Sequence, residues 1–372
     1  MSSVPDLTRR DEPAGWLRGQ SLAGAFDPRR NALGFLRLLF AGVVALIHAW
    51  QTGFGHQPSV GRTLLGDLAV DGFFVLSGFL VAASWLRLQS VRRYAWHRFL
   101  RIMPGFWVCL VVTAVLLAPI AAVLAGRDAG SVLTGEEPAW RYVLANAGLP
   151  VLQYGIGGVP HPTEAGSAVF DGALWTLQYE AFCYGVIALL GVAGVLHRRS
   201  RLLAVVALVW VALAAETAGL VPVDVPVLAN EQVFRFLLVF LLGAAAHVYA
   251  DVVPVHRAWA VGAAVLTSAA LVLFDQYRLL GGVGFAYLCV YAAVRSPLKG
   301  NPRWDLSYGL YVYHYPVQLL MALGGLAVLG EWGFAALSIA LAAVLAAVSW
   351  VVVERPALRL KDAAWVERRV SR

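Results

Sequence analysis

The sequence predicts an all-α polytopic membrane protein with about ten transmembrane helices in a single bundle, and three observations support this class. Apolar residues make up 60% of the 372 residues and charged residues only 14%, whereas a soluble domain carries about 25% charged residues. Apolar segments close to the ~20 residues that a helix needs to cross a bilayer recur along the chain. Basic residues gather in the short segments between them, as in cytoplasmic loops.

Ten segments are expected to span the bilayer, and no long polar insert separates them. They are 33–50, 64–86, 104–125, 172–196, 202–220, 233–250, 258–274, 279–294, 306–329 and 334–353. The seventh and eighth are short, so a re-entrant hairpin within 258–294 is an alternative. We expect one transmembrane domain over 33–354, with a long external loop at 126–171, between an N-terminal tail (1–32) and a C-terminal tail (355–372).

The basic residues also set the expected orientation. Of the arginines outside the helices, Arg62, Arg127, Arg141 and Arg278 face one side, and the others face the opposite side with the lysines. The positive-inside rule makes the richer side cytoplasmic. Both termini are then cytoplasmic, and the protein is expected in the plasma (inner) membrane. Basic loops beside anionic lipid explain the net charge of +7 without nucleic acid.

Ionisable residues inside spanning helices are costly and rare, so those in this chain are candidates for function. Arg37 and His48 lie eleven positions apart in the first segment, close to three helical turns, so both project from one face. With the N-terminus inside, Arg37 lies towards the cytoplasm and His48 towards the outer leaflet. The alternative roles are a snorkelling arginine and an outer-edge anchor.

Two carboxylates are expected in the outer third of the bilayer. Asp71, in the second segment, lies at a depth like that of His48, whose imidazole it could orient. Glu180, in the fourth segment, closes a motif that starts at Trp175 and could take the same role. The sequence leaves open which of the two orients His48. Ser77, beside a glycine in the second segment, favours close helix packing.

Further candidates lie at the inner face and in the ninth segment. Arg98 and Arg101 are three positions apart in a basic run, so they face one side of a helical turn and could clamp a phosphate. A positive-inside signal explains the same run. Tyr308 belongs to an aromatic stripe that fits packing. His314 is expected mid-membrane, two positions before the helix-breaking Pro316.

This distribution suits direct acyl transfer to a hydroxyl group. An imidazole can take the proton of the acceptor alcohol as the alcohol attacks a thioester, and a carboxylate can orient that imidazole. No serine lies in a nucleophile elbow, and no cysteine has a convincing base. The three cysteines also lack the spacing of metal ligands. We therefore expect neither an acyl-enzyme nor a metal site.

These motifs, in this order, resemble the acyltransferase-3 family of membrane O-acyltransferases, bacterial proteins that acylate sugars and other hydroxylated acceptors. The resemblance covers nearly all of 31–360. It rests on six motifs: Arg37 with His48, Phe73-Phe74-Val75-Leu76-Ser77-Gly78-Phe79, Arg98 with Arg101, Trp175 to Glu180, Ser307 to Pro316, and Glu354-Arg355-Pro356. Two departures, Gly72 after Asp71 and Gln178-Tyr179 before Glu180, concern the acceptor side.

The resemblance implies specific roles for these residues. His48 would be the catalytic base, and Arg98 and Arg101 would hold the phosphates of coenzyme A at the cytoplasmic side. The pantetheine arm would pass Arg37 on its way to His48. The expected activity is transfer of an acyl group, acetyl by default, from acyl-CoA to a hydroxyl of a sugar-containing acceptor. Acyl-CoA (acetyl-CoA) is a co-substrate, and no permanently bound cofactor is expected.

Two other classes of function are weighed against this one. A proton-coupled transporter or flippase of a glycolipid or small solute could use intramembrane His, Asp and Glu as a proton relay, but the chain has no inverted repeat. A membrane scaffold would leave the intramembrane charges unexplained. The sequence leaves open the identity of the acceptor, which could be a surface polysaccharide, a glycolipid or a glycosylated small molecule such as a macrolide. It also leaves open the acyl group and the oligomeric state, for which a homodimer is one alternative.

Overall fold

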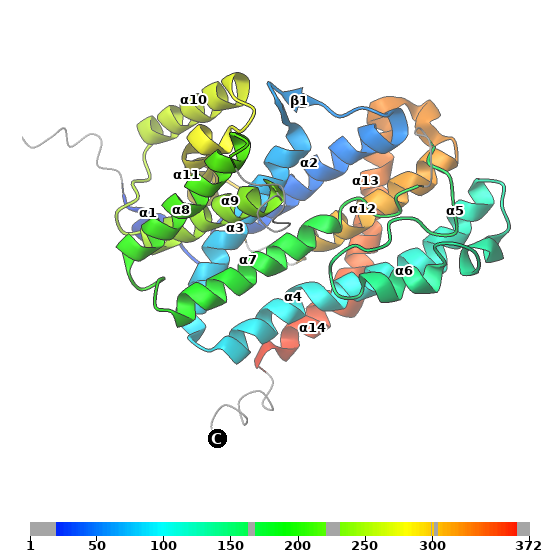
Figure 1. Ribbon diagram of the computed structural model, residues 1–372, viewed down its shortest axis with the longest axis horizontal. Helices are drawn as coiled ribbons and strands as arrows, with labels where there is room; N and C mark the ends of the chain where they lie inside the picture. The colour runs from blue at the N-terminus through cyan, green and yellow to red at the C-terminus, as the bar shows by residue number, and fades with distance from the viewer. Residues whose placement is uncertain (1–19, 163–167, 221–230, 299, 301–303, 363–372) are drawn as a thin grey trace, which may run out of the picture.

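The computed structural model describes residues 20–162, 168–220, 231–298, 300 and 304–362, and this part of the chain is predominantly helical (Figure 1). Its helices are α1 (Leu22–Ala25), α2 (Leu33–Phe54), α3 (Leu65–Leu88), α4 (Val91–Val112), α5 (Ala118–Leu124), α6 (Ala139–Asn146), α7 (Trp175–Val192), α8 (Arg199–Thr217), α9 (Glu231–Val248), α10 (Arg257–Leu273), α11 (Arg278–Arg295), α12 (Ser307–Leu323), α13 (Gly330–Ser349) and α14 (Arg355–Arg359). Strands β1 (Ser59–Val60) and β2 (Thr63–Leu64) form a small antiparallel hairpin.

Six helical stretches of the described chain are long and apolar enough to cross a membrane: Leu33–Phe54, Leu65–Leu88, Val91–Leu124, Arg199–Thr217, Arg278–Arg295 and Leu326–Arg359. Two apolar helices, Gln232–Val248 and Arg257–Leu273, are shorter. These stretches confirm the all-α polytopic class. Each of the ten expected segments contains a helix, and a total of ten membrane crossings stays a prediction.

Two expected boundaries are wrong. The third long helix begins at Val91, where the side chain of Ser90 caps it, so Pro104 lies inside α4 and does not open it. A π-helical turn, Thr113–Leu117, joins α4 to α5. The last helix also extends past 353, because a second π-helical turn joins α13 to α14, which reaches Arg359. The expected tails 1–32 and 355–372 are therefore partly helical, and 1–19 and 363–372 lie outside the described residues.

Ion pairs between loops support the alternating direction of the helices. The turn before α8 is joined to the turn before α10 by Arg199 and Asp251. On the opposite side, Arg62 of the β-hairpin pairs with Asp275, and His56 bonds to Glu331. Each pair joins two connections that the sequence places on the same side of the bilayer, which agrees with the predicted topology. Which side is cytoplasmic stays a prediction from the basic residues.

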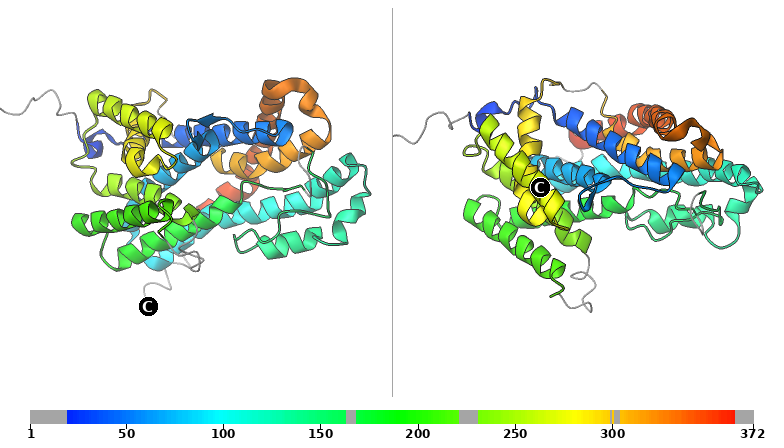
Figure 2. Two further views of the ribbon diagram at one scale, coloured as in Figure 1. Left: turned by 45° about the horizontal axis from the view of Figure 1, so that its top comes forward. Right: turned by 90° about the horizontal axis from the view of Figure 1, so that it is seen from above.

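The centre of the bundle is built from α2, α3, α9 and α12. Helices α3 and α9 approach closely because each carries a glycine at the crossing point. A Cβ atom on Gly78 would lie 1.9 Å from the carbonyl oxygen of Phe240, and one on Gly243 would lie 2.0 Å from that of Val75. Helices α12 and α13 both contact α2, and in Figure 2 the orange and red segments of the chain lie at the blue α2. The polar residues of the first, second and ninth segments thus face the inside of the bundle.

The long loop before α7 enters the bundle before that helix begins. It contains the short helix α6, and its last residues, Phe170, Asp171, Ala173 and Leu174, are at most 2% exposed. Helix α7 therefore starts inside the protein, at Trp175, and not at an outer surface near residue 172. This recessed start carries Glu180 deeper into the bundle than the sequence predicted.

Candidate active site

His48 and His314 lie against each other where α2 packs on α12, and we call them the histidine pair. His48 Nδ1 is 2.8 Å from His314 Nε2, and the two rings are nearly parallel, at 7°. His314 Nδ1 lies 3.1 Å from the backbone oxygen of Leu310, one turn earlier on α12. The ring of Tyr315 packs edge-on against His48. The structure thus gives His48 a histidine partner in place of the expected carboxylate.

These contacts fix the positions of the ring protons. A carbonyl oxygen only accepts hydrogen bonds, so His314 Nδ1 must carry a hydrogen and donate it to Leu310. In a neutral ring His314 Nε2 is then an acceptor, and His48 Nδ1 must be the donor to it. His48 Nε2 keeps its lone pair, and no described residue bonds to it. The pair therefore presents one unprotonated nitrogen, as general-base catalysis requires.

Pro316 does not break α12, contrary to the sequence prediction. The helix runs from Ser307 to Leu323 through the proline. A proline leaves the carbonyl four residues earlier without its usual amide donor. Here that carbonyl belongs to Val312, and the thiol of Cys109 on α4 lies 3.2 Å from it, as a donor. A neighbouring helix thus supplies the missing partner, and His314 is held on an unbroken helix.

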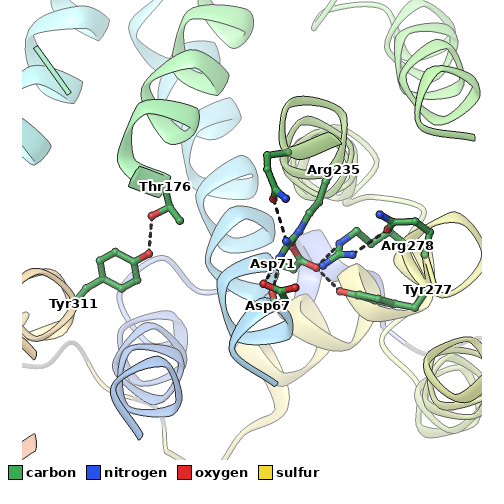
Figure 3. Close-up of polar contacts among 9 residues, drawn as sticks. Asp67, Asp71, Thr176, Arg235, Tyr277, Arg278 and Tyr311 are labelled. Atoms are coloured by element: carbon green, nitrogen blue, oxygen red, sulfur yellow. Dashed lines mark hydrogen bonds and ion pairs between the residues drawn. The ribbon is translucent and has the colours of Figure 1, made fainter. Parts of the chain in front are cut away.

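Asp71 belongs to a different cluster, shown in Figure 3. Its side chain is fully buried, and its carboxylate accepts from Arg235 Nε at 3.3 Å, Arg278 Nε at 2.6 Å and the hydroxyl of Tyr277 at 2.7 Å. Arg235 also pairs with Asp67, at 3.1 Å. Two arginines and two aspartates neutralise one another here. The sequence placed Arg278 in an external loop, but it begins α11 and is buried.

Glu180 also has partners other than His48. One of its carboxylate oxygens accepts from the hydroxyls of Ser77, at 2.8 Å, and Tyr184, at 2.7 Å. Glu180 lines a pocket of about 40 Å³ between α2, α3, α7 and α12. The residues around this pocket are Arg37, Val70, Phe73, Phe74, Ser77, Thr176, Leu177, Glu180, Ser307, Tyr308 and Tyr311. The recessed start of α7 thus groups Glu180 with Arg37.

The pocket leads from Arg37 towards the histidine pair. At one end Tyr308 donates its hydroxyl hydrogen to the backbone oxygen of Ile102, at 2.8 Å. At the other end Tyr311 has its hydroxyl 2.6 Å from Thr176 Oγ1, as Figure 3 shows. The ring of Tyr311 lies edge-on to His314, with 6.1 Å between centroids. Trp175 packs on Tyr179 and Phe236 beside the pocket and does not line it.

A carboxylate that the sequence analysis missed, Asp305, joins two of the predicted arginines. It forms ion pairs with Arg101, at 2.9 Å, and with Arg37, at 3.3 Å, and it accepts a hydrogen bond from the hydroxyl of Ser307 at 2.7 Å. Burial alone would raise the pKa of Asp305, but Arg101 and Arg37 hold this pKa well below its usual range. Asp305 lies just before the motif at Ser307, at the N-terminal end of α12. This position is the sequence signal that could have identified it as a site residue.

Arg98 and Arg101 lie on the same turn of α4 but take different partners. The guanidinium of Arg98 lies over the rings of Tyr94 and Tyr184, at 5.9 and 5.4 Å. Its Nε is buried and bonds to no described residue. Asp305 forms ion pairs with Arg37 and Arg101 but not with Arg98. Of these four residues, Arg37 lines the pocket, and Arg98 is the arginine without a carboxylate partner among the described residues.

Comparisons with known proteins identify the family. Residues 30–354 match the model of the Acyl_transf_3 family, described as an acyltransferase domain. Nodulation protein 10 of Rhizobium leguminosarum bv. viciae is 28% identical over 368 residues, covering 92% of this chain and 96% of the relative. An O-acetyl transferase of Shigella phage Sf6 is 25% identical over 306 residues, covering 78% and 85%. No solved structure matches. The chain therefore belongs to the acyltransferase-3 family and is a membrane O-acyltransferase.

Proposed function

We propose that the protein transfers an acyl group, acetyl by default, from cytoplasmic acyl-CoA to a hydroxyl of a sugar-containing acceptor, with His48 as the general base. The observation that carries this proposal is the pair of contacts from His314 to Leu310 and to His48, from which we assign an unprotonated Nε2 to His48. The family supports O-acyl transfer. An acceptor alcohol is too weakly acidic to attack a thioester without a base in hydrogen-bond reach. His48 is placed to be that base.

The inner arginines support a donor that carries phosphate groups. Arg37 and Arg101 pair with Asp305, whereas Arg98 has no ion pair among the described residues, so a phosphate would meet a guanidinium that no carboxylate neutralises. Arg98 offers a donor nitrogen that no described residue uses. Arginine binds phosphate well because its planar group offers several donors in a fixed geometry. We assign Arg98 to the donor phosphates first, with Arg101 following when phosphate displaces Asp305.

The pocket between Arg37 and the histidine pair is the proposed path of the pantetheine arm. Its ~40 Å³ holds only a few water molecules, so the path must widen when the donor binds. The Tyr311–Thr176 hydrogen bond closes its end beside His314. We expect donor binding to break this bond. Widening would then coincide with the arrival of the thioester at the histidine pair, and water would be kept out of the path until that moment.

The proposed reaction is one displacement through a tetrahedral intermediate. His48 Nε2 takes the proton of the acceptor hydroxyl as the hydroxyl oxygen bonds to the acyl carbon. The carbon–sulfur bond then breaks, and the leaving thiolate of coenzyme A takes the proton from His48. While His48 is an imidazolium ion, its Nδ1–H still donates to His314 Nε2, which stabilises the charge. His314 is thus a positioning residue, and its own position is set by Leu310.

Radiolabel transfer tests the proposal. Protein reconstituted in liposomes would receive acetyl-CoA labelled in the acetyl group, with membranes of the source cells as acceptor. We expect label in the acceptor and free coenzyme A with wild type. His48→Ala should reduce both by 10²–10⁴-fold, the usual contribution of a general base. His56→Ala is the matched control, because this exposed histidine follows α2. Normal turnover by His48→Ala would overturn the proposal.

The transporter alternative gains no support from Asp71. A proton relay needs a carboxylate that changes its protonation during transport, whereas Asp71 is held by two arginines and a tyrosine. The same liposomes address this alternative. A transporter would accumulate the labelled compound inside the vesicles and leave the thioester intact.

A further inference from the structure

Two buried polar side chains lie one helical turn beyond the histidine pair. Thr52 is four residues after His48 on α2, and Gln318 is four residues after His314 on α12. Residues four apart lie on the same face of a helix, with Cβ atoms about 5–6 Å apart. Both side chains are 0% exposed. Each histidine therefore has an uncharged polar neighbour on its own face, towards the C-terminal ends of the two helices.

Both neighbours have an oxygen without a hydrogen-bond partner among the described residues. A threonine inside a helix usually donates to the carbonyl four residues earlier, here that of His48. Thr52 Oγ1 makes no such bond. In most native structures a buried hydroxyl has a partner, since an unpaired one costs about 1–3 kcal/mol. Thr52 therefore keeps an unused donor and acceptor beside the histidine pair.

The amide of Gln318 is fixed in one orientation. Its Nε2 donates to the backbone oxygen of Ala45, at 2.7 Å, three residues before His48. Because that carbonyl only accepts, the nitrogen must face Ala45, and Oε1 faces elsewhere. Gln318 Oε1 is buried without a described partner. This hydrogen bond to α2, the helix that carries His48, thus fixes the position of Gln318, whose Oε1 is an unused acceptor.

We propose that Thr52 and Gln318 form an acceptor subsite that binds the hydroxyl groups next to the one being acylated. This inference rests on the proposed function, because it takes His48 Nε2 as the atom that meets the reacting hydroxyl. A sugar offers hydroxyls on adjacent carbons, each both a donor and an acceptor. Gln318 Oε1 would accept from one neighbouring hydroxyl, and Thr52 Oγ1 would donate to or accept from another. The substrate class is a vicinal polyol, and an isolated alcohol is a poor acceptor.

The unpaired oxygens give the subsite its selectivity. A site built to bond a substrate hydroxyl rejects an analogue that lacks it, because the buried polar groups then stay unpaired. An acceptor that pairs both oxygens removes the cost of leaving them unpaired. An alcohol without neighbouring hydroxyls covers the same oxygens and leaves that cost in place. The orientation of the acceptor, and therefore the hydroxyl that is acylated, depends on these two bonds.

Kinetics on three variants test the subsite, with acetyl-labelled acetyl-CoA as donor and a titration of source-cell membranes as acceptor. Thr52→Val keeps the shape and removes the hydroxyl, whereas Thr52→Ser keeps the hydroxyl. We expect Thr52→Val to raise the apparent KM for acceptor about 3- to 10-fold, the worth of one neutral hydrogen bond. The KM for acetyl-CoA should not change, and Thr52→Ser should restore most of the acceptor binding. Thr63→Val is the matched control, since Thr63 on β2 also has a buried, unpaired hydroxyl.

The thermal midpoint separates this role from a structural one. Removing an unpaired hydroxyl should leave the Tm of Thr52→Val unchanged or higher. An unchanged acceptor KM, or a rise in KM that comes with a lower Tm or a higher donor KM, would overturn the subsite. If wild type transfers no label, the proposed function fails and the subsite fails with it. If wild type transfers label and Thr52→Val matches it in every constant, the subsite alone fails.

Discussion

Two buried polar clusters lie inside this bundle, and they differ in what they leave unpaired. The carboxylate of Asp71 has two arginines and a tyrosine around it, and the atom that this cluster leaves without a described partner is a donor, Arg278 Nη2. The histidine pair is a chain of donors that starts at a backbone carbonyl and ends at His48 Nε2, an acceptor with no described partner. We call the first cluster closed, since its carboxylate is fully used, and the second open, since it keeps a basic atom. A buried ionisable group is thus a candidate base only where its partners leave a basic atom unused.

The largest expected effect concerns the closed cluster. Asp71→Asn would leave the buried guanidinium of Arg278 without a carboxylate and that of Arg235 with Asp67 alone, and breaking a buried ion pair typically costs about 3–5 kcal/mol of stability. We expect the free energy of unfolding in mixed micelles to fall by this amount. Asp275→Asn is the control, since its pair with Arg62 is exposed and contributes at most about 1 kcal/mol. A stable Asp71→Asn protein without transfer activity would instead indicate that Asp71 takes part in the reaction, together with the histidine pair.

From the sequence we expect Asp71 or Glu180 to orient His48, whereas in the structure His314 lies against it. Depth in the bilayer was estimated from distance along each segment, and on that basis Asp71 and Glu180 lie level with His48. The recessed start of α7 shifts Glu180 towards Arg37. Two arginines from segments far along the chain neutralise Asp71. Neither effect leaves a signal in the local sequence.

The fold was more predictable than the site because it follows from local patterns. Apolar length gave the helices, and basic loops gave their alternation, which the loop-to-loop ion pairs support. The boundaries at Pro104 and Glu354 failed because residues around them continue a helix through a proline or a π-helical turn. Such continuations depend on packing against neighbouring helices. Propensity alone does not reveal them.

A second prediction concerns the partner of His48. His314→Phe removes the acceptor for His48 Nδ1–H and frees the ring to rotate, so kcat should fall about 10- to 100-fold, as for other groups that orient a reactive side chain. His314→Gln should retain more activity, because its amide oxygen can accept the same hydrogen. Steady-state kinetics would check this, with KM for acetyl-CoA expected to stay constant. Equal losses in the two variants would argue against an orienting role.

A smaller effect is expected at the inner face. Arg98→Ala should raise the KM for acetyl-CoA about tenfold with little change in kcat, because a charge-assisted bond to a phosphate is lost. Arg93→Ala, on the same helix, is a suitable comparison for a general loss of basic charge. Equal KM values for the two variants would show that Arg98 does not bind the donor and serves only as a basic residue that orients the protein in the membrane.

The smallest effect is a pH dependence at Asp305. Its pKa in the folded protein is lowered, so its ion pairs with Arg101 and Arg37 contribute fully to stability above the ordinary aspartate pKa of about 4. The contribution is lost progressively as the pH falls below that value. Thermal unfolding should therefore show Asp305→Asn less stable than wild type at pH 7, with the gap narrowing towards pH 3. A gap that widens on acidification would contradict the pairing.

The protonation of the two rings can be measured directly by solid-state NMR on protein labelled with ¹⁵N-histidine in lipid bilayers. Signals would be assigned by their loss in His48→Gln and His314→Gln. At neutral pH we expect both rings to be neutral with the hydrogen on Nδ1, so that the Nε2 of His48 gives the signal of an unprotonated nitrogen. A hydrogen on His48 Nε2 in the resting protein would exclude His48 as the general base, because this nitrogen could not take the proton of the acceptor hydroxyl.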